Sequence, residues 1–209
     1  MEAGRRPRSC VRLEVLRPTH ARRQPIARQL PHSHDLGAFS RATQRRAAGD
    51  VSRVGPVSVP ETMSAEHIQQ VREAFINAAR HARDAGFDGV EIHGANGYLL
   101  DAFLTDYLNT RTDDYGGTVA NRVRLATEVC ADVAAAVGDD IAVGVRISQS
   151  KVSDSDHRWA GGEDDAAAVF TALSDTGIDY IHTTEYRALA PAFDDTDKTL
   201  AALAKHYSG

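Results

Sequence analysis

The chain has 209 residues, of which 42% are hydrophobic and 25% are charged, and its formal net charge is −5. These values are ordinary for a soluble globular protein and fit one domain, with or without a tail. They exclude a membrane protein, since no run of about 18 apolar residues is present. The two distant cysteines, Cys10 and Cys130, match neither a disulfide framework nor a zinc site. Together with the lack of an apolar leader segment, they predict a reducing, cytoplasmic location.

Charge divides the chain into two parts. Residues 1–60 hold twelve arginines, no lysine and four acidic residues, a net +8, whereas residues 61–209 carry a net −13. Scattered Arg and Pro with few aliphatic residues cannot bury enough surface to offset chain entropy. We therefore expect residues 1–60 to be a disordered basic tail, or the product of a misread coding region. Clustered arginines attract phosphate, but here they lack interleaved aromatic residues, so we do not expect nucleic-acid binding.

Residues 61–209 repeat a pattern of helix, glycine, strand and loop. Apolar residues at helical spacing predict three helices, each ended by a glycine; their ranges are 65–85, 119–137 and 166–176. Strands are predicted to follow them at 88–94, 141–148 and 179–185. A fourth helix, 200–207, is not followed by the strand that the pattern requires, and this indicates a truncated chain. Strands alternating with helices imply a parallel sheet built from βαβ units.

Alternation along the strands sorts the side chains onto two faces. In 141–147, the odd-numbered residues are Ile and Val and suit packing under helices, whereas Gly144 and Arg146 share the other face. His93 shares the corresponding face of the strand at 88–94. In (β/α) folds, functional groups gather at the carboxyl ends of the strands. His93 and Arg146 are predicted to lie at such ends.

Three segments resemble the Old Yellow Enzyme family of FMN-dependent ene-reductases, which are TIM barrels. The segments are "FDGVEIHGANGYLLDAFL" (87–104), "NTRTDDYGGTVANRVRL" (109–125) and "VGVRIS" (143–148). The similarity spans roughly residues 54–209. It implies an α/β fold, a partial TIM (β/α) barrel of about three parallel strands with flanking helices, preceded by the basic tail of residues 1–60.

The resemblance also implies a role for four residues. His93 and Asn96 would hydrogen-bond the substrate carbonyl oxygen, Tyr98 would donate a proton, and Arg146 would contact the flavin ring. Hydride addition to the β-carbon of an activated alkene builds enolate charge on that oxygen, and preorganised donors stabilise such charge. A tyrosine, with a reference pKa near ~10, is an acid able to protonate an enolate. The implied cofactor is FMN, the reductant is NAD(P)H, the substrate is a small enone, and no metal is involved.

Length separates this chain from the family. A TIM barrel has eight strands and about 250 residues, and its FMN phosphate binds at loops after the last two strands. Those strands would follow Gly209. We therefore expect the chain alone to bind FMN weakly and to have little ene-reductase activity. An open sheet also exposes unpaired strand edges, which predicts a homo-oligomer or aggregation.

Two alternatives stay open at this point, and a third is disfavoured. The chain could be a non-catalytic fragment that serves as an interaction or assembly module, or a nucleic-acid-associated protein acting through residues 1–60. A dienoyl-CoA reductase shares much of the motif around His93, but it needs an iron–sulfur cysteine cluster that two distant cysteines cannot provide. His157 and Trp159 lie either over the active-site mouth or in a variable loop.

Overall fold

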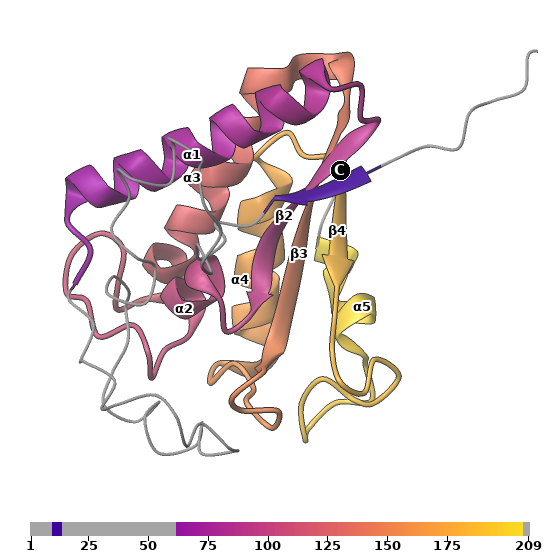
Figure 1. The fold of residues 1–209 in the computed structure, drawn as a ribbon. Coiled ribbons are helices and arrows are strands. Elements are labelled where there is room, and N and C mark those ends of the chain that lie inside the picture. The colour runs from indigo at the N-terminus through magenta and orange to yellow at the C-terminus, as the bar shows by residue number, and fades with distance from the viewer. Residues whose placement is uncertain (1–9, 14–61, 207–209) are drawn as a thin grey trace, which may run out of the picture.

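A parallel four-stranded sheet in the order β1-β2-β3-β4 forms the centre of the protein (Figure 1). The computed structural model describes residues 10–13 and 62–206. The strands are β1 (Cys10–Leu13), β2 (Gly89–Asn96), β3 (Ala142–Lys151) and β4 (Tyr180–Thr183). Each strand pairs in parallel with the next one in chain order. The three strands predicted from the sequence are therefore confirmed, and a fourth is added.

The added strand, β1, comes from the segment that we expected to be disordered. Leu13 is buried, and the partly buried Val11 packs against the same core. A strand of four residues is too short to show a period-2 pattern, so these two contacts could not be foreseen. The remaining part of the prediction for residues 1–60, a disordered or misread tail, lies outside the described residues.

The helices follow the strands in the predicted order, with two differences. They are α1 (Ala65–Asp84), α2 (Leu99–Leu104), α3 (Val119–Val137), α4 (Gly162–Ser174) and α5 (Leu200–Leu203), with 3₁₀ turns η3 (Gly138–Asp140) and η4 (Ala204–His206). The short α2 was not predicted, and α5 gives way to η4 sooner than the apolar spacing suggested. Ser64 and Thr118 cap α1 and α3, each side chain accepting a backbone N–H three residues on. None of the described helices is long and apolar enough to cross a bilayer.

The hydrophobic core lies between the sheet and the layer formed by α1, α3 and α4 (Figure 1). The helix-facing side chains of β2 and β3 are almost completely buried; they are Val90, Ile92, Val143, Val145 and Ile147. The other face of the sheet is polar and carries Glu91 and His93 on β2, Arg146 on β3 and His182 on β4. Parallel strands covered by helices on one face, with the other face free of helices, match the arrangement of a wall of a TIM barrel.

Candidate active site

A row of three basic side chains crosses the polar face of the sheet. His93 of β2 is paired in register with Arg146 of β3, and Arg146 with His182 of β4. His93 is buried, and His182 is half-exposed with its Nδ1 at 2.9 Å from Glu91 Oε2. Parallel strands in register thus bring together residues that are about fifty and forty positions apart in the sequence.

Arg146 is only partly satisfied by the described residues. Its Nη2 donates to Thr184 Oγ1 at 3.1 Å, while its Nε is buried and has no hydrogen-bond partner among them. A buried N–H without an acceptor is unfavourable, and such groups usually serve a ligand or an ordered water. The orphaned Nε therefore fits the expectation that Arg146 contacts an electron-rich group of a bound cofactor.

The end of β2 turns through two residues in the left-handed region. Asn96 has φ +63° and Gly97 has φ +84°; among the described residues, Asn96 is the only non-glycine with positive φ. This turn returns Tyr98 to His93, whose ring centroid lies 5.1 Å from that of Tyr98. Tyr98 is 55% exposed, and its carbonyl accepts the N–H of Ala102 at 2.7 Å as the first bond of α2.

The structure thus brings the four predicted site residues together, but Arg146 lies in the middle of β3 and not at its carboxyl end as predicted, because the strand continues to Lys151. The rings of His93 and Tyr98 contact each other, Asn96 lies on the turn between them, and Arg146 is the register neighbour of His93. The exposed phenol and the buried imidazole differ in access to solvent, as a proton donor and a fixed hydrogen-bond donor would. Their catalytic roles remain predictions.

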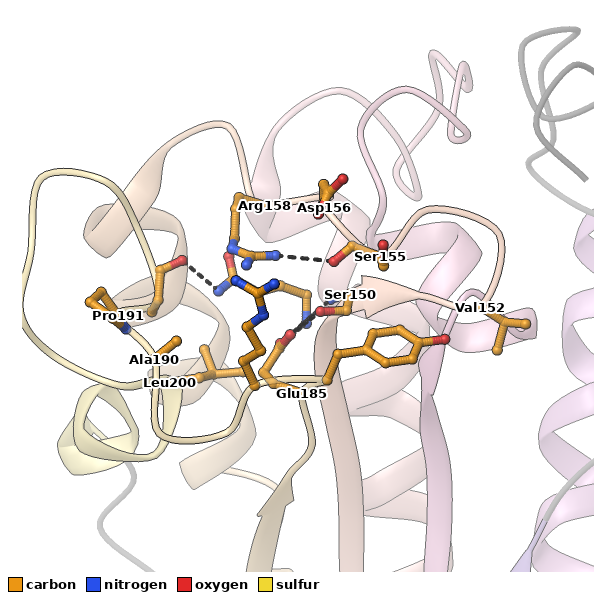
Figure 2. A pocket seen from close by; sticks show the side chains of 13 residues that line it. Ser150, Val152, Ser155, Asp156, Arg158, Glu185, Ala190, Pro191 and Leu200 are labelled. Atoms are coloured by element: carbon orange, nitrogen blue, oxygen red, sulfur yellow. Dashed lines mark hydrogen bonds between the residues drawn. The ribbon is translucent and has the colours of Figure 1, made fainter.

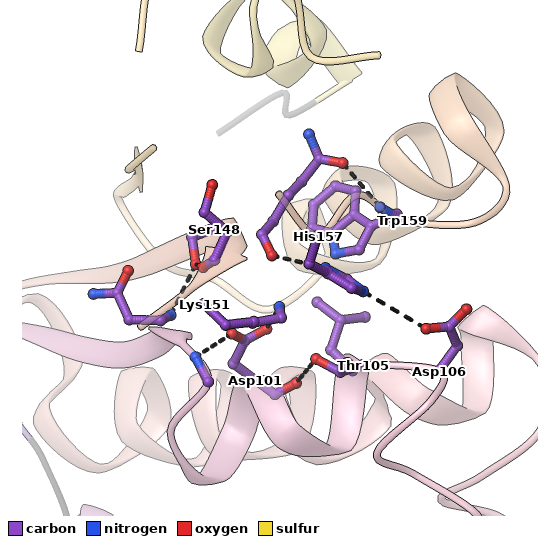
Figure 3. A network of polar contacts seen from close by, with 12 residues as sticks. Asp101, Thr105, Asp106, Ser148, Lys151, His157 and Trp159 are labelled. Atoms are coloured by element: carbon purple, nitrogen blue, oxygen red, sulfur yellow. Dashed lines mark hydrogen bonds and ion pairs between the residues drawn. The ribbon is translucent and has the colours of Figure 1, made fainter. Parts of the chain in front are cut away.

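A buried polar network lies directly beneath this turn (Figure 3). Lys151 Nζ lies 2.6 Å from Asp101 Oδ1, and both side chains are fully buried. The other carboxylate oxygen of Asp101 accepts the N–H of Gly97 at 2.6 Å. Burial raises the pKa of Asp101, and the contacts with Lys151 and the Gly97 N–H oppose that rise. The turn is therefore held from below by a charged pair that does not reach solvent.

His157 and Trp159 belong to the same buried region rather than to a freely exposed loop (Figure 3). His157 Nδ1 donates to the carbonyl of Gln149 at 2.8 Å, and the backbone N–H of Trp159 donates to Gln149 Oε1 at 3.0 Å. Burial, and secondarily the charge of Lys151, lowers the pKa of His157. The neutral imidazole of His157 therefore holds the segment that follows β3 against Gln149, near the end of that strand.

A cavity of about 440 Å³ opens at the carboxyl ends of β3 and β4 (Figure 2). Its floor includes Glu185, whose carboxylate accepts the N–H of Gln149 at 2.6 Å and also contacts the backbone and hydroxyl of Ser150. None of the four predicted site residues lines this cavity. Within the described residues, no group of three His, Cys, Asp or Glu side chains could hold a metal ion.

Comparison with known proteins assigns the chain to a family. Residues 27–205 match the model of the NADH:flavin oxidoreductase / NADH oxidase family, and the chain belongs to that family. It is 39% identical to a putative 12-oxophytodienoate reductase 10 of Oryza sativa subsp. japonica, over 77% of this chain and 51% of the relative. It is 43% identical to 12-oxophytodienoate reductase 2 of Arabidopsis thaliana, over 69% of this chain and 37% of the relative. The chain thus spans about half the length, or less, of these curated relatives.

Solved structures give the same result for the fold. An Old Yellow Enzyme homologue from Zymomonas mobilis is 34% identical with a TM-score of 0.61, covering 73% of this chain and 42% of that one. A mutant of morphinone reductase in complex with tetrahydroNAD is 29% identical with a TM-score of 0.59, covering 74% of this chain and 40% of that one. The predicted resemblance to the Old Yellow Enzyme family and the partial (β/α) barrel are confirmed.

Sequence reasoning missed the residues that support the site. Asp101 and Lys151 lie 50 positions apart, and neither belongs to a recognisable pattern of its own. The available signal was weak: a lysine after the polar residues "SQS" that follow "VGVRI", and an aspartate inside the apolar run "LLDAFL". Charged residues are rarely buried unless they are paired, so each one taken alone favoured an exposed position.

Proposed function

We propose that this chain acts in the FMN-dependent reduction of α,β-unsaturated carbonyl compounds, with NAD(P)H as reductant. The observation that carries the proposal is that His93 and Tyr98 contact each other where β2 ends, with Asn96 between them, while Arg146, in the middle of β3, is the register neighbour of His93. Membership of the flavin oxidoreductase family supports it. A relative from Leishmania infantum that is 49% identical over 51% of this chain is named a probable flavin mononucleotide-dependent alkene reductase.

The side chains suit the charge changes of this reaction. When bound, reduced FMN supplies the hydride that the β-carbon of the alkene receives. Negative charge then develops on the substrate oxygen, where an N–H of His93 and the carboxamide of Asn96 would donate hydrogen bonds that strengthen as the charge grows. The phenol of Tyr98 would protonate the α-carbon, and its exposure leaves room for a substrate beside it. Arg146, with its unsatisfied Nε, would hold the electron-rich edge of the cofactor ring.

We further propose that the described residues alone hold FMN weakly. Arg146 provides a contact to the ring, but a phosphate also needs a cationic cradle or a free helix N-terminus. The first turn of α4 carries Glu163, Asp164 and Asp165, and that of α1 carries Glu66, so these two N-termini would repel a phosphate. The first turn of α3 carries no acidic residue, but the Thr118 side chain already accepts one of its N–H groups.

One experiment tests both parts of this proposal. The full chain is titrated with FMN and the quenching of flavin fluorescence is followed; enone-dependent oxidation of NADPH is then measured with excess FMN. We expect weak FMN binding, and a slow enone-dependent rate that falls when His93 is replaced in His93→Ala. The matched control is His81→Ala, because His81 is exposed on α1. A rate that stays the same in His93→Ala, or no enone-dependent rate at saturating FMN, would refute the proposed reaction.

A second function, as an assembly module, is favoured by the edges of the sheet. Within the described residues, β1 and β4 each pair with one strand, so each has one edge without a strand partner. Such edges template association with another chain. Sedimentation velocity of the full chain tests this: a concentration-dependent oligomer supports it, and a monomer at all concentrations opposes it.

We also propose a cytoplasmic location, which the buried free thiol of Cys130 suits.

A further inference from the structure

The buried pair of Asp101 and Lys151 is costly for a purely structural contact. Both side chains are fully buried, and their charged atoms lie 2.6 Å apart. Removing two charges from water is expensive, and replacing such a pair by apolar residues of similar volume often leaves a protein as stable or more stable. Because this pair lies beneath the Asn96–Gly97 turn, we consider a role for it other than stability.

The pair contacts the turn from two elements. Asp101 lies in the first turn of α2, and its Oδ2 accepts the N–H of Gly97 at 2.6 Å. Lys151 is the last residue of β3 and the register partner of Asn96. Its Cβ lies only 3.4 Å from the point that a Cβ on Gly97 would occupy. The turn is thus enclosed between the carboxylate and the lysine stem.

The conformation of the turn needs such support. Asn96 and Gly97 are both in the left-handed region, which an asparagine adopts less readily than a glycine. The N–H of Asn96 donates to Ser148 Oγ at 2.8 Å, and its carbonyl accepts the N–H of Val152 at 3.1 Å. With Asp101 on the next N–H, these contacts of Asn96 and Gly97 come from β3, the residue after it and the buried pair, while the N–H of Tyr98 closes the turn on the carbonyl of Ala95 at 3.2 Å.

We propose that Asp101 and Lys151 are positioning residues that fix the Asn96–Gly97 turn, so that the Asn96 carboxamide and the Tyr98 phenol keep their places beside His93. This inference rests on the proposed alkene reduction for its functional meaning. The carboxylate supplies the acceptor for Gly97, and the lysine keeps that carboxylate in place by occupying its other oxygen. Neither residue touches the reacting atoms. A displacement of reacting groups by about 1 Å can cost about 100-fold in rate, which sets the size of the expected effect.

Two double variants separate positioning from stability. Asp101→Leu/Lys151→Met replaces the pair by apolar residues and removes the acceptor for Gly97. Asp101→Asn/Lys151→Met also removes both charges but retains a side-chain oxygen that can accept the Gly97 N–H. If the pair served only stability, the two variants would differ only in thermal midpoint. If it positions the turn, the Asn variant will keep the turn and the Leu variant will lose it.

The first readout is independent of flavin and of activity. In ¹H–¹⁵N NMR spectra of the full chain, a Gly97 N–H bonded to a carboxylate oxygen should resonate downfield and exchange slowly with solvent. We expect both signatures to be lost in Asp101→Leu/Lys151→Met and to be largely restored in Asp101→Asn/Lys151→Met. Unchanged Gly97 and Tyr98 amides in the Leu variant, with that variant folded, would overturn the inference.

The second readout is the enone-dependent rate with excess FMN. We expect kcat to fall by about 100-fold in the Leu variant, with most of the rate kept in the Asn variant. A loosened turn with an unchanged kcat would overturn the positioning role. If the parent chain itself shows no enone-dependent rate, the proposed function fails, and the NMR comparison still decides whether the pair holds the turn.

Discussion

At the scale of single residues, the proposed chemistry depends most on Tyr98. Its ring contacts His93, and 55% of the residue is exposed. Removing the hydroxyl in Tyr98→Phe leaves the ring contact in place, so the fold should not change. The group that would donate the proton is then missing, and its loss should affect only the alkene step.

We predict that Tyr98→Phe slows alkene reduction by about 100-fold, the usual size of a general-acid contribution. The NADPH half-reaction should keep its rate, because no alkene takes part in it. Anaerobic stopped-flow measurement of the two half-reactions, with excess FMN, checks this. Equal losses in both half-reactions, or none in either, would show that Tyr98 is not the proton donor.

His157 gives the protein a predictable response to acid. Its folded pKa is lowered by burial, while the unfolded chain takes up a proton near 6.5. Between the lowered folded value and 6.5, the unfolded state binds more protons, so stability rises with pH across that window. The contribution of His157 to the free energy of unfolding is fully present above pH 6.5 and is lost as the pH falls below 6.5.

We therefore predict a steeper fall of the free energy of unfolding below pH 6.5 in the parent than in His157→Asn. Asparagine can still donate to the carbonyl of Gln149 but does not titrate. Urea unfolding at several pH values measures both profiles, which should run parallel above the window. Parallel profiles throughout the acid range would contradict a buried neutral imidazole.

The four candidate site residues could be named from sequence motifs, whereas the residues that support them could not. His93, Asn96 and Tyr98 lie within six positions of one another, so one local motif carries them. Asp101 and Lys151 meet only because α2 folds back under the end of β3. A six-residue helix has too few turns to show helical periodicity, and without α2 the partner of Lys151 is invisible.

At the scale of elements, the longer units were predictable because their apolar spacing is strong. The expected helices match α1, α3 and α4 to within a few residues, and glycines end or follow them as expected. The exceptions are short: β1, α2 and α5 have four to six residues each. Tertiary packing, rather than local sequence, decides the structure of such short segments.

The layer of helices should carry most of the stability. Leu125 of α3 is fully buried in the core between the helices and the sheet. We predict that Leu125→Ala lowers the free energy of unfolding by about 3 kcal/mol, from lost burial and the cavity left behind. Leu189→Ala is the matched control, since Leu189 is 93% exposed. Urea denaturation checks both variants, and a Leu125→Ala chain as stable as the control would contradict the described core.

At the scale of the whole molecule, the described part is one wall of a barrel. Its apolar face packs against helices, and its polar face presents Glu91, His93, Arg146 and His182 in adjoining register rows. The family match and the two solved structures, each covered to less than half of its length, agree with this arrangement. We therefore propose an oxyanion site at the carboxyl end of β2, with a cofactor contact on β3.

A phenolate tests that site most directly, because its charged oxygen on a flat ring imitates an enolate. The measurement is ¹⁹F NMR of 4-fluorophenol titrated with the chain and excess FMN, using 4-fluoroanisole as the analogue without an ionisable hydroxyl. We predict a saturable shift of the fluorophenol signal, which is lost in His93→Ala and in Asn96→Ala. We predict no such shift for fluoroanisole. Equal binding by the parent and both variants, or equal binding of fluoroanisole, would contradict it.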